Sequence, residues 1–231
     1  MPTTLITGAG RGIGLELARQ YLDAGWTVHA GCRRPEGAQD LRTMAASSEG
    51  GLTVHELDVT DAAQIRALAT RLSGESIDIL VNNAGLYGPR DASFGNVDDA
   101  AWIETIRVNA IAPLHLAEAL IDQVARSERR IIANMTSKMG SVGDNTSGGH
   151  YIYRSSKAAL NIVTSSLAVD LAGRGVTAIV LHPGWVRTDM GGGGAPLTAE
   201  DSVTGIRRVL DSVGPEDSGR FFGHDGVEVP W

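Results

Sequence analysis

The chain contains few residues of the kinds that mark several classes of protein. It has a single cysteine, Cys32, in 231 residues, which excludes an internal disulfide framework and fits a reducing compartment. No apolar run is long enough to span a bilayer, and the first eight residues lack the charged and apolar regions of a signal peptide. No group of cysteine and histidine residues has the spacing of a metal site. These absences predict a cytoplasmic protein with no metal centre and no membrane partner.

Basic and aromatic residues are also scarce. The net charge is -7 at pH 7 and aromatic residues make up 5% of the chain, so there is no basic footprint or stacking platform for nucleic acid. Glycine is abundant, with 29 residues scattered at turn-like positions. Such glycines predict tight corners between strands and helices, and backbone that lies close to a ligand.

Short apolar runs alternate with amphipathic segments along the chain. Strands are expected at 3–7, 27–31, 52–57, 77–81, 130–135, 176–181 and 220–222. Helices are expected at 13–24, after a cap at 60–61, across 98–126 with a break near Asn109 and Pro113, at 151–171 and at 199–211. The alternation predicts one α/β domain over residues 1–231, a doubly wound Rossmann domain with a parallel sheet of about seven strands and helices on both faces.

A glycine-rich segment follows the first predicted strand and opens the first helix. It reads Thr-Gly-Ala-Gly-Arg-Gly-Ile-Gly, and its candidate phosphate-binding residues are Gly8, Gly10, Arg11, Gly12, Ile13 and Gly14. Glycines let the backbone approach a pyrophosphate, and the free N–H groups of a helix N-terminus favour an anion. A glycine-rich turn without a ligand is the alternative, but the position between strand and helix favours a dinucleotide.

The end of the second strand indicates which dinucleotide is bound. An NAD site usually has a carboxylate there for the ribose 2′-hydroxyl, but no acidic residue occurs before Glu36. Arg33 and Arg34 follow the strand instead, and Arg11 is expected to face the same region. Guanidinium groups can clamp a 2′-phosphate, so NADP(H) is preferred over NAD(H). The alternative is that the two arginines are only solvated.

Tyr153 and Lys157 are one helical turn apart, which puts a phenol and an ammonium on one helix face. The lysine is expected to lower the pKa of the tyrosine from about 10 toward about 7, which needs roughly 4 kcal/mol of differential stabilisation. Tyr153 would then serve as a general acid or base at neutral pH. Tyr151 cannot form this pair because its partner four residues on is Ser155.

Several motifs, taken in their order along the whole chain, resemble those of the short-chain dehydrogenase/reductase family. The motifs are the glycine loop, Asp58-Val59, Asn82-Asn83-Ala84-Gly85, Asn109, Ser137, Tyr153 with Lys157, and Pro183-Gly184 with Thr188. The segments 156–161 and 182–192 and the final Pro230-Trp231 are similar to the C-factor-like carbonyl reductase branch.

The resemblance implies four catalytic residues. Ser137 would hydrogen-bond a substrate carbonyl, and Tyr153 would give it a proton. Lys157 would bind the nicotinamide ribose and lower the pKa of Tyr153, and Asn109 would hold a water in a proton relay to Lys157. Thr136 and Ser141 are alternatives to Ser137, which is preferred because Gly140 completes the family's S-x-x-G arrangement.

The resemblance also implies further contacts with the cofactor. They are Asp58 and Val59 at the adenine, Asn83, Ala84 and Gly85 at its ribose and beside the central strand, and Pro183, Gly184, Val186 and Thr188 near the nicotinamide.

The predicted function is NADPH-dependent reduction of an aldehyde or ketone to an alcohol. The alternative is a C-factor-like signalling or nucleotide-sensing protein with incidental turnover. The substrate pocket would be largely apolar, with a C-terminal lid at about 187–212 and an unusually long loop at 143–149. Helices around 101–126 and 151–171 are expected to form a homodimer, with a homotetramer as the alternative. The apolar residues considered for this interface are Ala112, Leu116, Ala119, Val163, Leu167 and Leu171.

Overall fold

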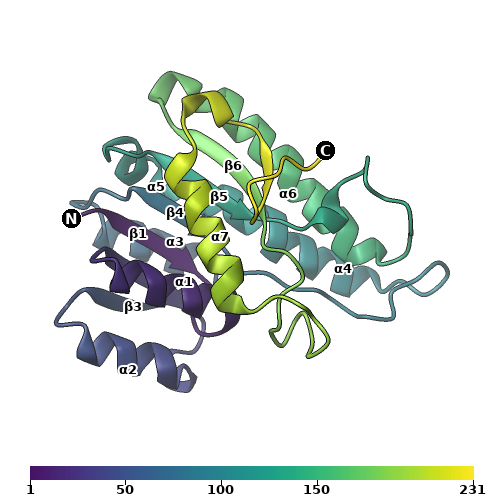
Figure 1. Cartoon of the computed structure of the whole chain (residues 1–231), viewed down its shortest axis with the longest axis horizontal. Helices are drawn as coiled ribbons and strands as arrows, with labels where there is room; N and C mark the ends of the chain where they lie inside the picture. Colours follow the sequence, from purple (N-terminus) through teal and green to yellow (C-terminus); the bar gives the residue numbers. More distant parts are fainter.

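The computed structural model describes residues 1–231 and is built on one sheet of seven parallel strands (Figure 1). The strands are β1 (Thr3–Thr7), β2 (Thr27–Cys32), β3 (Leu52–Glu56), β4 (Ile79–Asn82), β5 (Ile131–Met135), β6 (Thr177–His182) and β7 (Phe221–Gly223). Their order across the sheet is β3-β2-β1-β4-β5-β6-β7. The predicted doubly wound Rossmann fold is therefore confirmed.

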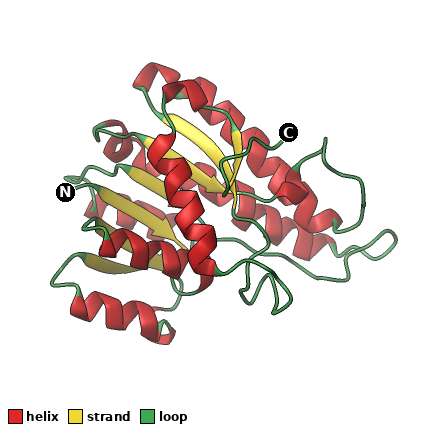
Figure 2. Cartoon of the chain, in the orientation of Figure 1, coloured by secondary structure: helices red, strands yellow, loops and turns green.

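Helices cover both faces of the sheet (Figure 2). They are α1 (Gly12–Asp23), α2 (Gln39–Ser47), α3 (Ala62–Arg71), α4 (Asp99–Ile106), α5 (Ala112–Ala125), α6 (Tyr151–Asp170) and α7 (Ala199–Ser212). One core cluster joins the sheet to α1, α2 and α7, and a second joins it to α3, α5 and α6. Every residue of the central strand β1 is buried, as expected for a parallel sheet covered on both faces.

The region expected to hold two helices broken near Asn109 and Pro113 is continuous. A π-helical segment, Arg107–Ile111, joins α4 to α5 without leaving the helical path. Pro113 directly follows this segment in the first turn of α5, where it has no N–H to donate to the preceding helical turn. Helix α2 was not predicted, since Leu41 is its only buried residue and its apolar pattern is weak.

The interface residues expected on α5 and α6 divide between the core and the surface. Ala112, Leu116 and Leu167 are buried in the core cluster against the sheet, and Ala119, Val163 and Leu171 are half-buried beside it. The apolar side chains left exposed on α4 and α6 are different ones, among them Ile103 on α4 and Ile162 and Val169 on α6. No helix combines the length and apolar character that a membrane crossing requires.

Candidate active site

The predicted site residues follow the carboxyl ends of β1, β2, β3, β4, β5 and β6 or lie on the helices next to them. Because all the strands are parallel, these ends share one edge of the sheet. The described residues contain no group of three or more metal-ligating side chains.

The glycine loop fits a pyrophosphate because its neighbours leave no room for side chains. Gly8 and Gly12 have φ values of +66° and +56°, which side chains disfavour. A methyl group on Gly8 would lie 2.8 Å from the Cα of Ala84, and one on Gly14 would lie 2.5 Å from Nδ2 of Asn83 and overlap the Gly8 carbonyl. The bare backbone therefore forms a cradle at the N-terminus of α1.

Asn83 and Ala84 hold this cradle in place from the end of β4. The Asn83 side chain donates to the carbonyl oxygens of Thr7 and Gly8 at 2.9 and 3.3 Å. The backbone amides of Asn83 and Ala84 donate to the Thr7 hydroxyl at 3.0 and 3.1 Å. These bonds agree with the predicted support of the central strand. Gly85 is next, and a methyl group there would lie 3.2 Å from Oδ1 of Asn109 and 3.6 Å from Nζ of Lys157.

Asp58 and Val59 lie beyond β3, next to the arginines that follow β2. The Asp58 carboxylate accepts hydrogen bonds from the amide and hydroxyl of Thr60 at 2.9 and 2.8 Å. Burial opposes ionisation of Asp58, but these bonds and the charges of Arg33 and Arg107 keep its pKa below the usual value. Val59 is buried.

The three candidate arginines for a 2′-phosphate do not share one environment. Arg33 and Arg34 are exposed and form no ion pair within the chain. Arg11, expected to face the same region, instead pairs with Asp189 at 2.6 Å. The reason is that the loop after β6 lies against the glycine loop, where a methyl group on Gly12 would be 3.3 Å from Cγ2 of Thr188. Asp189 was missed because nothing in its sequence position indicates this contact.

The segment after β6 holds Pro183, Gly184, Val186 and Thr188 beside that loop. The Thr188 hydroxyl donates to the Val186 carbonyl at 3.4 Å and accepts from the Gly191 amide at 3.1 Å. The Ser202 hydroxyl on α7 donates to the Pro183 carbonyl at 2.6 Å, and α7 packs in the core, so the second half of the predicted lid is a fixed part of the fold. Gly184 has φ +85° and Val186 is buried.

Tyr153 and Lys157 lie in the first two turns of α6, with exposed fractions of 8% and 5%. Nζ of Lys157 is 5.9 Å from the centroid of the Tyr153 ring and donates to the Met135 carbonyl at 2.7 Å. The structure thus brings the phenol and the ammonium together, but the ammonium bonds to the end of β5 instead of the phenol oxygen.

Burial dominates the protonation of both groups. It raises the pKa of Tyr153 to about 12, with Tyr87 adding to the rise and the Ser137 hydroxyl opposing it. Burial also lowers the pKa of Lys157 to about 8. In the chain without its cofactor, desolvation of the phenolate therefore outweighs an ammonium directed at Met135, and the lowering of the Tyr153 pKa in the working site stays a prediction.

Ser137 is the one hydroxyl of the three candidates that is not tied to other parts of the core. It caps a short 3-10 turn, Lys138–Gly140, by accepting from the Met139 amide at 3.2 Å. The Thr136 hydroxyl donates to Oδ1 of Asn161 at 2.6 Å, and that of Ser141 donates to the Trp231 main-chain oxygen at 3.3 Å. Since both alternatives are engaged away from Tyr153, the geometry agrees with the choice of Ser137.

Gly140 explains how Ser137 reaches this position. A methyl group on Gly140 would lie 2.8 Å from both the carbonyl carbon and Cβ of Lys157. The turn after β5 can therefore rest directly on α6, which is the physical content of the S-x-x-G spacing.

Asn109 lies in the π-helical segment and is fully buried. Its side chain accepts from the Leu86 amide at 2.8 Å, and donates to the Leu86 carbonyl at 2.8 Å and to the Ser156 hydroxyl at 2.9 Å. These bonds fasten the segment after β4 to α6. Widening the helix at this point is what turns the amide toward the site.

Two histidines, His150 and His182, lie near the site and make different contacts. His150 contacts the Tyr87 hydroxyl through Nδ1 at 3.2 Å. Burial, aided by His224 and Lys138, lowers the pKa of His182 to about 4, and its Nδ1 is buried without a partner. His182 is therefore neutral at physiological pH.

Tyr87 lies against Tyr153 in a way that the sequence pattern does not predict. Its ring stacks on that of Tyr153, with centroids 4.4 Å apart and planes at 20°. Arg90 lies over the Tyr87 ring at 5.2 Å. The stack follows no sequence periodicity, because the β4–α4 connection and α6 meet only in the tertiary structure.

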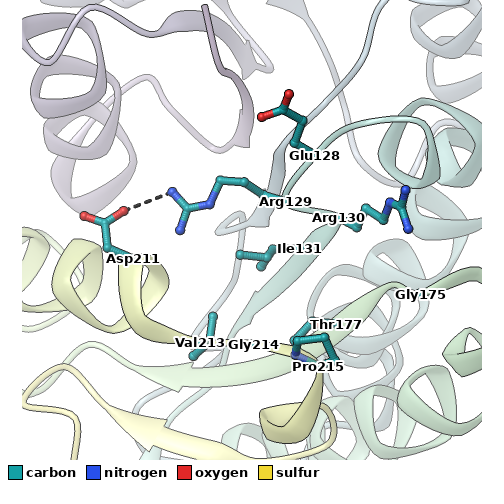
Figure 3. Close-up of a pocket in the computed structure, with 10 residues that line it drawn as sticks. All are labelled: Glu128, Arg129, Arg130, Ile131, Gly175, Thr177, Asp211, Val213, Gly214 and Pro215. Atoms are coloured by element: carbon teal, nitrogen blue, oxygen red, sulfur yellow. Dashed lines mark hydrogen bonds and ion pairs between the residues drawn. The ribbon is translucent and has the colours of Figure 1, made fainter.

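A cavity of about 400 Å³ lies elsewhere, where β5 and β6 begin (Figure 3). Its lining includes Arg129, Ile131 and Thr177, and Arg129 pairs with Asp211 at 3.0 Å on its rim. Since β5 and β6 are parallel and the site residues follow their ends, this cavity is at the opposite edge of the sheet from Tyr153.

Comparisons with known proteins agree with this geometry. The family model for short chain dehydrogenases matches residues 2–195. The chain is 47% identical over 167 residues to the C-signal of Myxococcus xanthus, covering 72% of this chain and all of that protein. It is 37% identical over 237 residues, and all of both chains, to 1-hydroxy-2-glutathionyl-2-methyl-3-butene dehydrogenase of Rhodococcus sp. (strain AD45).

Solved structures give the same result. The carbonyl reductase Sniffer of D. melanogaster superposes with a TM-score of 0.95 at 33% identity, and covers all of both chains. An NADPH-bound carbonyl reductase from chicken fatty liver superposes with a TM-score of 0.93 at 35% identity, over 100% of this chain and 99% of that one. The chain therefore belongs to the short-chain dehydrogenase/reductase family and is an oxidoreductase. The predicted resemblance to this family is confirmed, and the match to the C-signal confirms the resemblance to C-factor-like proteins.

Proposed function

We propose that this protein is an NADPH-dependent reductase that converts an aldehyde or ketone to an alcohol, in a reversible reaction, with Tyr153 as the proton donor. The observation that carries the proposal is the meeting of Ser137, Tyr153 and Lys157 at the sheet edge that also holds the glycine cradle. Similarity to carbonyl reductases, one of them NADPH-bound, supports the same reading.

Each residue has a proposed role. The Ser137 hydroxyl would donate a hydrogen bond to the substrate oxygen, and the Tyr153 hydroxyl would transfer its proton to that oxygen. When bound, the reduced nicotinamide supplies the hydride to the carbonyl carbon. Lys157 would bind the ribose hydroxyls, and Asn109 would hold a water in a proton relay to Lys157. With a pKa of about 12, Tyr153 is protonated at pH 7, the state in which it can donate to the substrate oxygen.

The cofactor contacts proposed from the sequence fit the cradle and its surroundings. Gly8, Gly10, Gly12, Ile13 and Gly14 would present backbone to the pyrophosphate. The remaining proposed contacts are Arg33 and Arg34 at the 2′-phosphate, which Arg11 would join by leaving Asp189, Asp58 and Val59 at the adenine, Asn83, Ala84 and Gly85 at its ribose, and Pro183, Gly184, Val186 and Thr188 near the nicotinamide.

Replacing the phenol tests the catalytic proposal. In Tyr153→Phe, NADPH oxidation with a panel of aldehydes and ketones should fall by about 10²- to 10⁴-fold, the usual contribution of a general acid. Tyr151→Phe is the matched control, because Tyr151 is 40% exposed on the same helix, two residues earlier, and should retain activity. Equal rates for wild type and Tyr153→Phe would overturn the assignment.

Removing one guanidinium tests the cofactor preference. In Arg33→Ala the KM for NADPH should rise much more than the KM for NADH, because only NADPH carries the 2′-phosphate. Arg66→Ala on the exposed side of α3 is the control and should change neither constant. If Arg33→Ala leaves the ratio of the two constants unchanged, the preference does not arise from this arginine.

The second candidate is a signalling or nucleotide-sensing protein, which the 47% identity to the C-signal favours. That function predicts dinucleotide binding, seen as a thermal shift, without turnover of any compound in the carbonyl panel. We favour the enzyme because Asn109, Ser137, Tyr153 and Lys157 are all present.

We also propose a cytoplasmic homodimer formed through α4, α5 and α6. Exposed Ile103, Ile162 and Val169 offer apolar surface for it. Light scattering should give twice the mass of one chain, and Ile162→Glu with Val169→Glu should give a monomer. A mass of four chains would favour the tetramer.

A further inference from the structure

We propose that Tyr87 is a positioning residue for Tyr153, holding the phenol in the orientation for proton transfer and keeping water from one ring face. The proposal rests on the proposed role of Tyr153. It begins from the parallel stack of the two rings, 4.4 Å between centroids at 20°. Tyr87 follows β4 in a segment without helix or strand, so this stack joins a loop to the catalytic helix.

Tyr87 is itself held by two further side chains. Its hydroxyl bonds Nδ1 of His150 at 3.2 Å, and the Arg90 guanidinium lies 5.2 Å from its centroid. Arg90 in turn donates to the carbonyl oxygens of Met190 and Asp189 at 2.6 and 3.4 Å. The Tyr87 ring is therefore fixed by Tyr153, by the residue before α6 and by the segment after β6.

His150 adds an independent sign of constraint. It directly precedes α6 and has φ +50°, a left-handed conformation that is uncommon for a residue with a side chain. Such conformations persist where the surrounding structure imposes them, often at functional sites. His150 lies three residues before Tyr153, and its imidazole contacts the Tyr87 hydroxyl.

Tyr153 has few other groups that could fix its ring. Lys157 directs its ammonium to the Met135 carbonyl, and Ser137, which accepts from the Met139 amide, acts on the Tyr153 hydroxyl and not on its ring. A general acid must nevertheless be held within a narrow range of positions, since small misplacements slow the reaction strongly. An aromatic stack supplies this restraint without adding a charge near the phenol.

Nitration by tetranitromethane tests the shielding without cofactor or substrate. In wild type, exposed Tyr151 should be nitrated, while Tyr153 and fully buried Tyr21 should be protected. Tyr87→Ala should raise the nitration of Tyr153 several-fold, measured on its peptide by mass spectrometry, and Tyr87→Phe should keep it protected. If Tyr21 also becomes nitrated in Tyr87→Ala, the variant has unfolded, and Tyr87→Leu, which keeps most of the side-chain volume, takes its place.

Kinetics test the positioning. Tyr87→Ala should lower kcat about 2- to 10-fold, the range expected from an aromatic stack, with KM for a small aldehyde little changed. Tyr87→Phe should restore kcat because the stack remains. Unchanged protection of Tyr153 in a folded Tyr87→Ala or Tyr87→Leu variant would overturn the proposal, as would an unchanged kcat. Wild-type protein inactive on every carbonyl compound would instead overturn the proposed function, while nitration would still report on the stack.

Discussion

Lys157 is a cation with almost no contact with water. Its ammonium has one hydrogen-bond acceptor from the chain, the Met135 carbonyl, and burial lowers its pKa to about 8. Below that pH it is charged and can bind ribose hydroxyls as a donor, and above it the charge is lost. The titration of the site near neutral pH therefore belongs to the lysine, while the phenol stays protonated.

This assignment predicts the pH dependence of carbonyl reduction. The rate should be constant from about pH 6 to about pH 7 and fall through pH 8 as Lys157 loses its proton. In Lys157→Arg the residual activity should lack that alkaline limb, because arginine stays charged to pH 12 and beyond. Profiles of kcat/KM for both proteins provide the measurement, and an unchanged limb in Lys157→Arg would assign it to another group.

Gly140 gives a second prediction at the scale of one residue. Gly140→Ala should destabilise the protein by about 1–3 kcal/mol, since its methyl group would lie 2.8 Å from the backbone of Lys157. It should also lower activity by moving Ser137 away from Tyr153. Gly74→Ala, where no atom lies within 4 Å of the added methyl group, is the control for urea denaturation. Equal stability of the two variants would contradict the close approach.

Individual site residues could be predicted where chemistry and spacing coincide. Tyr153 and Lys157 share a helix face in any α-helix, so the sequence alone brings them together. The Tyr87 stack and the Arg11–Asp189 pair could not be predicted, because each joins residues from separate elements. The pKa of Tyr153 could not be predicted either, since it depends on burial that only the packed molecule determines.

Two neighbouring strands carry a buried pair of histidines. Nδ1 of His29 on β2 lies 3.0 Å from Nε2 of His55 on β3, with Glu75 3.4 Å from His29 and Arg71 3.4 Å from His55. Burial, together with His29 and Arg71, lowers the pKa of His55 to about 4. The folded pairing of β2 with β3 therefore favours the neutral form of His55.

Acid should therefore weaken the fold. His55 takes up a proton near pH 6.5 when unfolded but only near pH 4 when folded, so its contribution is complete above pH 6.5 and is lost as the pH falls toward 4. The loss is at most about 3 kcal/mol. Urea denaturation should give a lower free energy of unfolding at pH 5 than at pH 7.5. His55→Gln should reduce this difference without abolishing it, because the pKa of His182 is also lowered to about 4. An unchanged difference in His55→Gln would exclude His55 as a source.

Elements with strong apolar patterns were predicted well, and those stabilised by particular contacts were not. Strands β1 and β4 are buried along their whole length, and their short runs of apolar and β-branched residues identify them. Helix α2 buries one side chain, which leaves little periodicity to detect. The π-helical segment at Asn109 is held by side-chain bonds to Leu86 and Ser156, which no propensity describes.

At the scale of the whole molecule, the parallel order of the strands determines where the site lies. Residues from all parts of the chain meet because seven parallel strands end at one edge, and this much follows from strand–helix alternation. The depth and lining of the substrate pocket do not follow from it. The 143–149 loop, which was expected to border that pocket, is tied to the end of the chain, because the Gly143 amide bonds the Trp231 main-chain oxygen at 2.8 Å.

The place of β1 at the centre of the sheet also affects how the chain is made. β1 can pair with β2 soon after both leave the ribosome, but its other partner, β4, begins at Ile79, 75 residues after Thr4. Until then a nascent chain displays one edge of a strand that is fully buried in the folded protein, with unpaired N–H and C=O groups. Such an edge is a template for aggregation, so synthesis that stalls before Ile79 leaves the most vulnerable strand of the protein open.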